Sequence, residues 1–312
     1  MISMSGFSKE FEYLNKIVEA GSFSIAAEQL YIAQPSLSQF VKRLEKNIGA
    51  EIFDRSHAPI QLTEAGKIYL EIGREIQELQ HSREKQIQDL GNFIQGQVRI
   101  GSSNYRSSTL LSKVIPIVKN RYPHIHITLE EGKTKELEDF ILQGKTDFSI
   151  VLHPFFNPGL QYIELFREEL LLVLSSSHPL CIHKDYTLSA NSKYPILDPH
   201  KLFHEPFIVM KEGQRLRSSF FEFTTENGFF PPIVLESGDM STAQTLAAAG
   251  VGATIVPAKL AAHCTAPIPP CYFSLRNFLS DWQVVIAFKK EKYLSKAAKT
   301  VIQIIEEITK ND

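Results

Sequence analysis

Cysteine is scarce in this chain, and its few cysteines follow no metal-binding pattern. The three, Cys181, Cys264 and Cys271, are odd in number and occur in no CxxC spacing, which disfavours a disulfide framework or a zinc ribbon. The histidine pairs at positions 124/126 and 200/204 lack the glutamate of HExxH, so we favour surface or core histidines over metal ligands. We therefore expect no metal site.

Long apolar runs, an excess of positive charge and enzyme signatures are also missing. The longest apolar stretch, near residues 246–256, is broken by Gly250 and Gly252, which also lack the third glycine of a dinucleotide fingerprint. No signal peptide, GxSxG motif or Walker loop is evident. A formal net charge of −2 is unlike that of proteins that coat DNA indiscriminately. We expect a cytoplasmic protein with no membrane contact, no cofactor and no enzymatic activity.

The length and the apolar content are those of a multidomain globular protein. A chain of 312 residues with 43% hydrophobic and 22% charged residues predicts two or three domains.

The segment FSIAAEQLYIAQPSLSQFVKRLEKNIG, residues 23–49, predicts two helices joined by a tight turn. In the second helix, one buried stripe is expected from Leu37, Val41, Leu44 and Ile48. The opposite face carries hydroxyls, an amide and cations, groups that suit base edges and phosphates: Ser36, Ser38, Gln39, Lys42, Arg43 and Lys46. This pattern indicates a helix-turn-helix, although any amphipathic helix of a soluble protein can carry a cationic face.

The surrounding residues resemble a known family. EAGSFSIAAEQL, AQPSLSQFVKRLEKNIG, and IFDR followed by LTEAG, in this order and spacing, resemble the N-terminal domain of LysR-type transcriptional regulators. The resemblance implies a winged helix-turn-helix in residues 1–62. For base reading we favour Gln34, Ser38 and Gln39, because amides can pair bidentately with adenine; for phosphates we favour Ser36, Lys42, Arg43 and Arg55. Pro35 suits the first helical turn.

The chain departs from the family pattern in its caps and charges. Ala33 stands where relatives usually place a serine, so a helix cap is missing. Gln39 replaces a frequent arginine, and the wing tip HAPIQ is not basic. Acidic residues outnumber the cations in the first 66 residues, so we expect tight double-stranded DNA binding to require more than one subunit.

A long helix is expected over residues 63–92, as a linker. Its apolar residues step at nearly the 3.5-residue period of a coiled coil, through Ala65, Tyr69, Ile72, Ile76 and Leu79, which predicts a homodimer. The alternative is a linker helix lying against its own sensor domain. The family resemblance further implies a homotetramer, a pair of dimers.

Strand and helix patterns alternate from about residue 97 onward, which predicts a largely parallel sheet. We expect two α/β lobes in residues 93–312, with lobe I over about 97–156 and 270–312 and lobe II over about 157–269. The predicted fold class is therefore α/β overall, with a winged helix-turn-helix, a linker helix and a two-lobed effector domain that resembles type 2 periplasmic binding proteins.

Polar residues that follow the strands are the expected effector site, because ligands of open α/β sheets bind beyond the carboxyl ends of the strands. We favour Ser102, Ser103, Tyr105, Met210, Lys211, Gln214 and Arg215, followed by Glu131, Leu152 and Gly252. The serines could instead only cap the next helix, and the cations could be surface charges. The expected effector is a small carboxylate or other anion.

The function favoured by the sequence is a DNA-binding transcriptional regulator controlled by a small molecule. Two alternatives remain open at this stage. One is a solute sensor whose N-terminal helices pair with a protein partner, and the other is an α/β enzyme with an appended interaction head, for which no base and nucleophile pair is evident.

Overall fold

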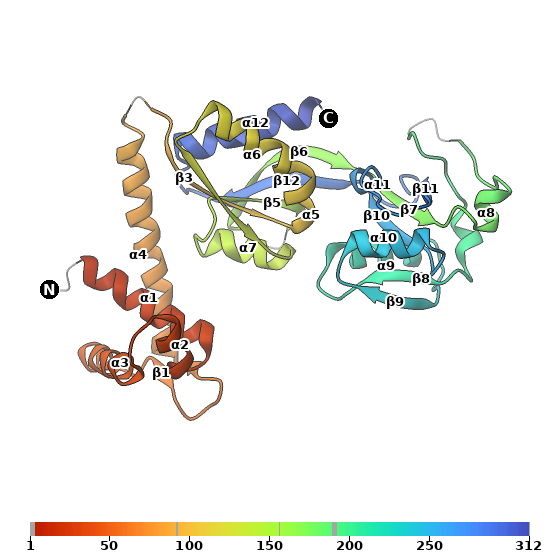
Figure 1. The fold of residues 1–312 in the computed structure, drawn as a ribbon. Coiled ribbons are helices and arrows are strands. Elements are labelled where there is room, and N and C mark those ends of the chain that lie inside the picture. Colours follow the sequence, from red (N-terminus) through yellow and green to blue (C-terminus); the bar gives the residue numbers. More distant parts are fainter. Residues whose placement is uncertain (1–3, 92, 156, 189–191, 312) are drawn as a thin grey trace. The chain divides into compact units, whose positions relative to one another are not determined.

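The computed structural model describes residues 4–91, 93–155, 157–188 and 192–311. The chain forms two compact units, Met1–Leu90 and Gly91–Asp312, which we call the head and the sensor. Figure 1 shows the head as helices with one small hairpin, and the sensor as two α/β lobes.

The head is a winged helix-turn-helix, as the sequence predicts. Its elements are α1 Met4–Ala20, α2 Phe23–Gln29, α3 Gln34–Ile48, β1 Phe53–Asp54, β2 Gln61–Leu62 and α4 Glu64–Gln88. The two short strands pair antiparallel. A single core joins these elements, and its fully buried side chains include Leu14, Leu37, Val41 and Phe53.

Helix α3 begins and ends as its sequence indicates. Ala33 stands at the N-cap in extended conformation and makes no side-chain capping bond. Pro35 occupies the first turn, where its missing N–H leaves no helical hydrogen bond unmade. Gly49 ends the helix at a φ of 76°, a left-handed conformation that glycine adopts without steric cost. One expectation is wrong: Ile48, predicted on the buried stripe, is 38% exposed because it lies in the last turn beyond the core.

Helix α4 is long, and its first turns pack on α1 and on the core of the head. Thr63 caps it by accepting a hydrogen bond from the Gly66 amide at 3.0 Å. Leu70 is buried in the head core, and the Tyr69 hydroxyl donates to Glu10 of α1 at 3.1 Å. The helix ends at Gln88, so it is shorter than the helix expected to reach about residue 92, a position that itself lies outside the described residues. Tyr69 therefore faces the head, although its spacing placed it on the predicted dimer stripe.

Lobe I of the sensor is built on a five-stranded sheet. The strand order is β4-β3-β5-β12-β6, with bounds Ile125–Glu131, Gly96–Ser102, Phe148–His153, Trp282–Lys289 and Leu160–Glu168. Strands β4, β3 and β5 are parallel, whereas β12 is antiparallel to both of its neighbours. Because β12 is antiparallel to both β5 and β6, strand β6 runs in the same direction as β4, β3 and β5, and the sheet is largely parallel as predicted, with β12 as its antiparallel member.

Helices cover both faces of this sheet. Alternate residues of β12 face opposite sides: Val284 and Ile286 join the core beneath α6 Ser112–Arg121 and α12 Lys296–Asn311, while Val285 and Ala287 join the core beneath α7 Thr134–Leu142. A short helix, α5 Asn104–Arg106, and a π-helical segment, Ser107–Leu111, connect β3 to α6.

Lobe II combines two smaller sheets. One has the order β10-β7-β11, all antiparallel, and the other is the parallel pair β8-β9. The strands span Leu170–Leu174 (β7), Phe207–Met210 (β8), Ile233–Ser237 (β9), Thr254–Pro257 (β10) and Cys271–Ser274 (β11). The helical segments are α8 Pro179–Ile182, the 3-10 segment Pro199–Leu202, α9 Arg215–Glu226, α10 Met240–Ala248 and α11 Ala258–Ala261.

Strand pairing moves the expected lobe boundaries. Strand β6 was expected in lobe II but pairs with β12 of lobe I, and β11 was expected in lobe I but pairs with β7 of lobe II. The chain therefore passes from lobe I to lobe II between β6 and β7, and returns between β11 and β12. We call these two connections the crossings. Sequence patterns did not reveal this exchange, because it is decided by pairing between segments about 100 residues or more apart.

Candidate functional site

The polar face of α3 is the candidate nucleic-acid interface of the head. Leu37, Val41 and Leu44 are buried, which leaves the other side of the helix to solvent. Most of the predicted contact residues on this helix are exposed, and Ser38 is half-buried: Gln34, Pro35, Ser36, Ser38, Gln39, Lys42 and Arg43. Within the described part of the chain, none of their side chains forms a hydrogen bond or ion pair that would occupy it. This face presents amides, hydroxyls and cations without a competing partner.

Arg55 differs from the other predicted phosphate contacts. Its guanidinium lies 2.9 Å from Glu45 of α3 and 5.1 Å from the centre of the Phe23 ring. The other oxygen of Glu45 accepts hydrogen bonds from the amides of Ile52 and Phe53. Glu45 thus links α3 to the first wing strand, and the ion pair with Arg55 is part of the same link. The structure therefore gives Arg55 a structural role in orienting the wing.

The wing tip packs on the turn between α1 and α2. The Ile60 amide donates to the Gly21 carbonyl at 3.0 Å. A Cβ built on Gly21 would lie 2.9 Å from the Pro59 Cβ, and Gly21 has a φ of 61°. Glycine is required there both by the close approach and by the left-handed backbone. The wing is thereby held close to the helical core of the head.

One side of α4 carries exposed apolar residues. Ile68, Ile72, Ile76 and Leu79 are 56%, 51%, 37% and 71% exposed. Ile68 was not included in the predicted stripe, although its spacing to Ile72 is helical. Apolar side chains at intervals of three and four on an exposed helix are typical of a helix–helix contact.

The sensor contains a cavity of about 590 Å³ between the two lobes. Lobe I lines it with the start of α5, the start of α7 and strand β5, and lobe II with the starts of α9 and α10. Its apolar wall includes Leu137, Leu152, Leu216, Met240 and Trp282. This volume suits a small metabolite.

The structure brings six of the ten predicted effector residues into this cavity. They are Ser103, Tyr105, Glu131, Leu152, Gln214 and Arg215. Several also have local structural roles, because Ser103 caps α5 and Gln214 donates to the Gly238 carbonyl at 2.9 Å.

The other four predicted residues lie outside the cavity lining, for identifiable reasons. The Ser102 and Met210 side chains are buried within their strands, and Lys211 is exposed to solvent. Gly252 faces the Pro206 carbonyl, which a Cβ would approach to 2.7 Å. Glycine is therefore needed at position 252 because a larger residue would collide with the backbone of Pro206.

Sequence reasoning missed the most buried charged group of the cavity. Arg106 is only 4% exposed and lines the cavity. Its Nη2 lies 2.5 Å from Oε2 of Glu168, at the end of β6. Its guanidinium also lies 4.8 Å from the ring centre of Tyr105 and 5.5 Å from that of Phe166. Arg106 and Glu168 are 62 residues apart, so no local pattern links them.

Glu168 contacts both lobes. Its Oε1 accepts a hydrogen bond from the Tyr105 hydroxyl of lobe I at 2.7 Å and another from the Lys259 amide of lobe II at 3.2 Å. Burial, and then the nearby Glu168 carboxylate, raise the pKa of Tyr105 well above its usual value. Tyr105 therefore remains a proton donor at any physiological pH.

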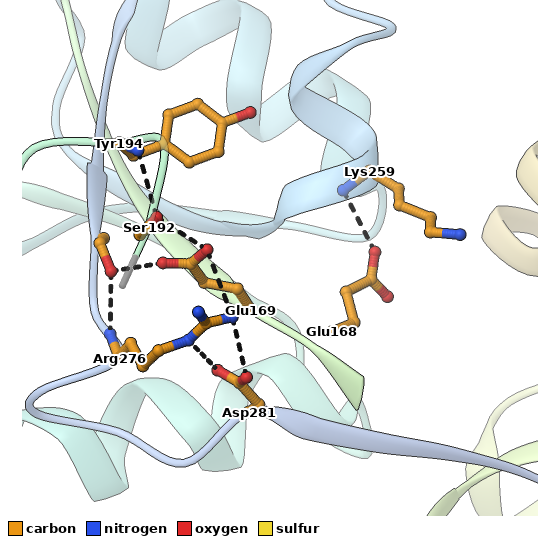
Figure 2. A network of polar contacts seen from close by, with 8 residues as sticks. Glu168, Glu169, Ser192, Tyr194, Lys259, Arg276 and Asp281 are labelled. Atoms are coloured by element: carbon orange, nitrogen blue, oxygen red, sulfur yellow. Dashed lines mark hydrogen bonds and ion pairs between the residues drawn. The ribbon is translucent and has the colours of Figure 1, made fainter. Parts of the chain in front are cut away.

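The adjacent Glu169 joins the two crossings. Figure 2 shows its carboxylate between Ser192 and Arg276. The Ser192 hydroxyl donates to it at 2.9 Å, Ser274 of β11 donates to its other oxygen, and Arg276 Nη2 lies 3.6 Å away. Arg276 in turn contacts Asp281 at 3.0 Å, one residue before β12. The outward and return crossings are thus connected by a single polar network.

Neither a cluster of metal ligands nor a membrane-crossing helix occurs in the described residues. Among them, no group of three or more His, Cys, Asp or Glu side chains is arranged to hold a metal ion. No helix in the same part of the chain has the length and apolar character to cross a membrane.

Comparison with known families assigns both units. Residues 8–67 match the family described as bacterial regulatory helix-turn-helix protein, lysR family. Residues 91–309 match the family described as LysR substrate binding domain.

Similar proteins extend over nearly the full chain. The uncharacterized HTH-type transcriptional regulator YcgK of Bacillus subtilis is 27% identical over 97% of this chain and 94% of its own length. The HTH-type transcriptional activator CmpR of Synechocystis is 24% identical over 95% of this chain and 93% of its own length. Full-length OxyR from Pseudomonas aeruginosa has a similar fold, with a TM-score of 0.69 at 22% identity over 96% of this chain and 93% of that one.

Proposed function

The chain belongs to the LysR family of transcriptional regulators, and from this premise we propose that it binds a specific operator through α3 and answers to a small anionic metabolite bound in the sensor cavity. Regulators of this family bind DNA and carry a substrate-binding domain, and they are not enzymes. The proposal depends above all on one observation, the exposed polar face of α3, whose side chains have no partner within the described chain. Because its target is chromosomal DNA, the protein acts in the cytoplasm.

Base reading is assigned to Gln34, Ser38 and Gln39. A glutamine side chain can make two hydrogen bonds to adenine at once, because its NH2 group donates to N7 and its oxygen accepts from the N6 amino group. A hydroxyl or an ammonium group cannot make this pair of contacts. Lys42, Arg43 and Ser36 hold the phosphates on either side. Support comes from their exposure along one helix whose opposite side is buried in the head core.

Two heads are held together through α4. The exposed face of Ile68, Ile72, Ile76 and Leu79 is suited to a second copy of itself, since a homodimer buries the same stripe twice. Paired heads read half-sites separated by whole helical turns of DNA. Two such dimers form the homotetramer, which supplies the multiple contacts that an acidic head needs.

Control by the effector follows from the position of the cavity between two lobes. A ligand that contacts both lobes favours the lobe arrangement that it binds best. The altered lobes change how the dimers associate, and with them the spacing or bend of the bound DNA.

The test is selection of binding sites by the full-length protein from a random duplex pool, followed by gel-shift titration. We expect enrichment of two-fold symmetric half-sites. Gln34→Ala should reduce discrimination at one base pair of each half-site by about 1–3 kcal/mol, whereas Gln86→Ala on the exposed side of α4 should not. Unchanged discrimination in Gln34→Ala would remove Gln34 from the reading surface, and a pool without enrichment would overturn operator recognition.

A further inference from the structure

Arg106 is built into the cavity wall, and neither of its terminal nitrogens makes a hydrogen bond within the described residues, although Nη2 is ion-paired with Glu168. Its side chain is buried, and its Nη1 has no hydrogen-bond partner in the described residues. A guanidinium carries five N–H donors, and a buried donor without an acceptor costs free energy. The arrangement is therefore incomplete until an acceptor enters the cavity.

The guanidinium is also held rigidly in place. The rings of Tyr105 and Phe166 lie within 5.5 Å of its central carbon, and Glu168 holds its Nη2. A fixed guanidinium recognises a planar acid group with little loss of side-chain entropy. The other cations of the lining, Lys133 and Arg215, are exposed and half-buried respectively, and neither has such a setting.

The carboxylates of the lining do not cancel this preference for an acid. Glu136 accepts a hydrogen bond from the Lys133 amide at 2.7 Å, and Asp239 accepts one from the Thr242 amide at 2.7 Å. Both carboxylates are thus engaged at the N-termini of α7 and α10, and the third carboxylate of the lining, Glu131 at the end of β4, is exposed to solvent. Only Glu168 contacts Arg106 directly.

We propose that Arg106 receives the acid group of the effector through Nη1, and that Glu168 is an internal carboxylate that competes with this acid for the guanidinium. The inference deepens the proposed function and rests on it. In the empty sensor Glu168 neutralises Arg106. In the occupied sensor two carboxylates share one guanidinium, which weakens the Glu168 contact.

The rest of the cavity defines the class of ligand. Leu152, Leu216, Met240 and Trp282 supply apolar surface to the same lining. A monocarboxylic acid with an aromatic or branched apolar body fits both parts of the site. Burial of its body contributes affinity, while the acid group on Arg106 provides orientation.

The first experiment uses the full-length protein and matched pairs of probes. Aromatic and branched-chain monocarboxylates are each compared with their uncharged amide, which has the same shape, in a thermal-shift assay and by the fluorescence of Trp282, the single tryptophan of the chain. We expect acids, and not their amides, to stabilise the protein and to change the emission of Trp282. Gly238→Phe is the cavity-blocking control, because Gly238 lines the cavity and a Cβ there meets no atom within 4 Å.

The second experiment removes the charge of Glu168 and measures whether acids then bind more tightly or more weakly. Glu168→Gln keeps the shape of the side chain and an oxygen for Tyr105 and Lys259, but removes the competing charge, so acids should bind roughly tenfold more tightly. The double variant Arg106→Gln with Glu168→Gln leaves no unpaired buried charge and should lose acid binding. Arg121→Gln, which changes an exposed arginine of α6 outside the cavity lining, is the matched control and should bind acids as the unchanged protein does.

The outcomes separate this inference from the proposed function. If neutral compounds bind and Gly238→Phe blocks them, the sensor role stands and the assignment of Arg106 is wrong. The assignment is also wrong if acids bind equally to the double variant, or if Glu168→Gln weakens acid binding. If neither the acids nor their amides bind, the assignment of Arg106 and of the ligand class is overturned, whereas operator recognition is decided separately by the binding-site selection.

Discussion

The head and the sensor place their working polar groups in opposite environments. On α3 the side chains proposed to read DNA are mostly exposed and contact nothing else in the described chain. In the sensor, Arg106 and Glu168 are 4% and 3% exposed and are paired with each other. A large, highly charged partner such as DNA can displace water from an open surface, whereas a small ligand must be recognised by groups that are already desolvated.

The largest expected difference concerns stability. Arg106→Ala leaves the Glu168 carboxylate buried without its counter-ion, which should cost about 3–5 kcal/mol of the free energy of unfolding. Arg121→Ala removes a cation that pairs with Glu307 at 3.3 Å with both side chains more than half exposed, and should cost less than about 1 kcal/mol. Urea unfolding followed by Trp282 fluorescence measures both. If both variants lose the same free energy of unfolding, burial of the Arg106–Glu168 pair does not add to its contribution to stability.

Substitutions on the exposed face of α3 should do the opposite: they should change DNA binding and leave the free energy of unfolding unaltered. Lys42→Ala should weaken binding to all DNA sequences alike and lower the slope of log K against log salt by about one per subunit. Lys67→Ala changes the same charge on α4, where Lys67 pairs with Glu64, and is the control. A loss confined to one operator sequence would instead assign base reading to Lys42.

The uncapped start of α3 gives a smaller effect. Ala33 has the extended backbone of an N-cap residue but no side-chain acceptor. Ala33→Ser should therefore stabilise the head by about 1 kcal/mol, and Ala33→Val, which offers no acceptor, should not. The measurement is urea unfolding by far-UV circular dichroism, with Trp282 fluorescence as the reference for the sensor. A gain in both variants would rule out capping as the cause.

The smallest effect concerns the contact between α4 and the head. Burial, and then the Glu10 carboxylate, raise the pKa of Tyr69 to about 12. Between pH 10 and 12 the unfolded chain loses this phenol proton while the folded head retains it, so stability falls as the pH rises. Tyr69→Phe should show a shallower fall over this range by circular dichroism. If the stability of both proteins falls equally over this pH range, the phenol of Tyr69 does not contribute to alkaline unfolding.

The two regions also differed in how far sequence could predict them. The buried stripe and polar face of α3 repeat within 15 residues, so the periodicity alone located Leu37, Val41 and Gln39. The missing cap at Ala33 was equally local. The exposed position of Ile48 could not be predicted, because it depends on where the neighbouring elements end.

In the sensor the individual strands and helices were predictable, but their pairing was not. β6 and β11 exchange lobes because their partners lie far along the chain. The same reason hid Arg106, whose significance depends on a glutamate in another strand. Loop serines after a strand were a correct indication of the region of the cavity, since Ser103 lines it while Ser102 is turned into the sheet.

Glu168 and Glu169 are neighbours, and this adjacency has a mechanical consequence. Consecutive side chains of extended backbone point to opposite sides, so one carboxylate reaches Arg106 while the other reaches Ser274 and Arg276. A single peptide unit links these two attachments. A backbone rotation at this peptide unit moves one carboxylate relative to the other, so the pair with Arg106 in the cavity and the network that joins the crossings are mechanically coupled.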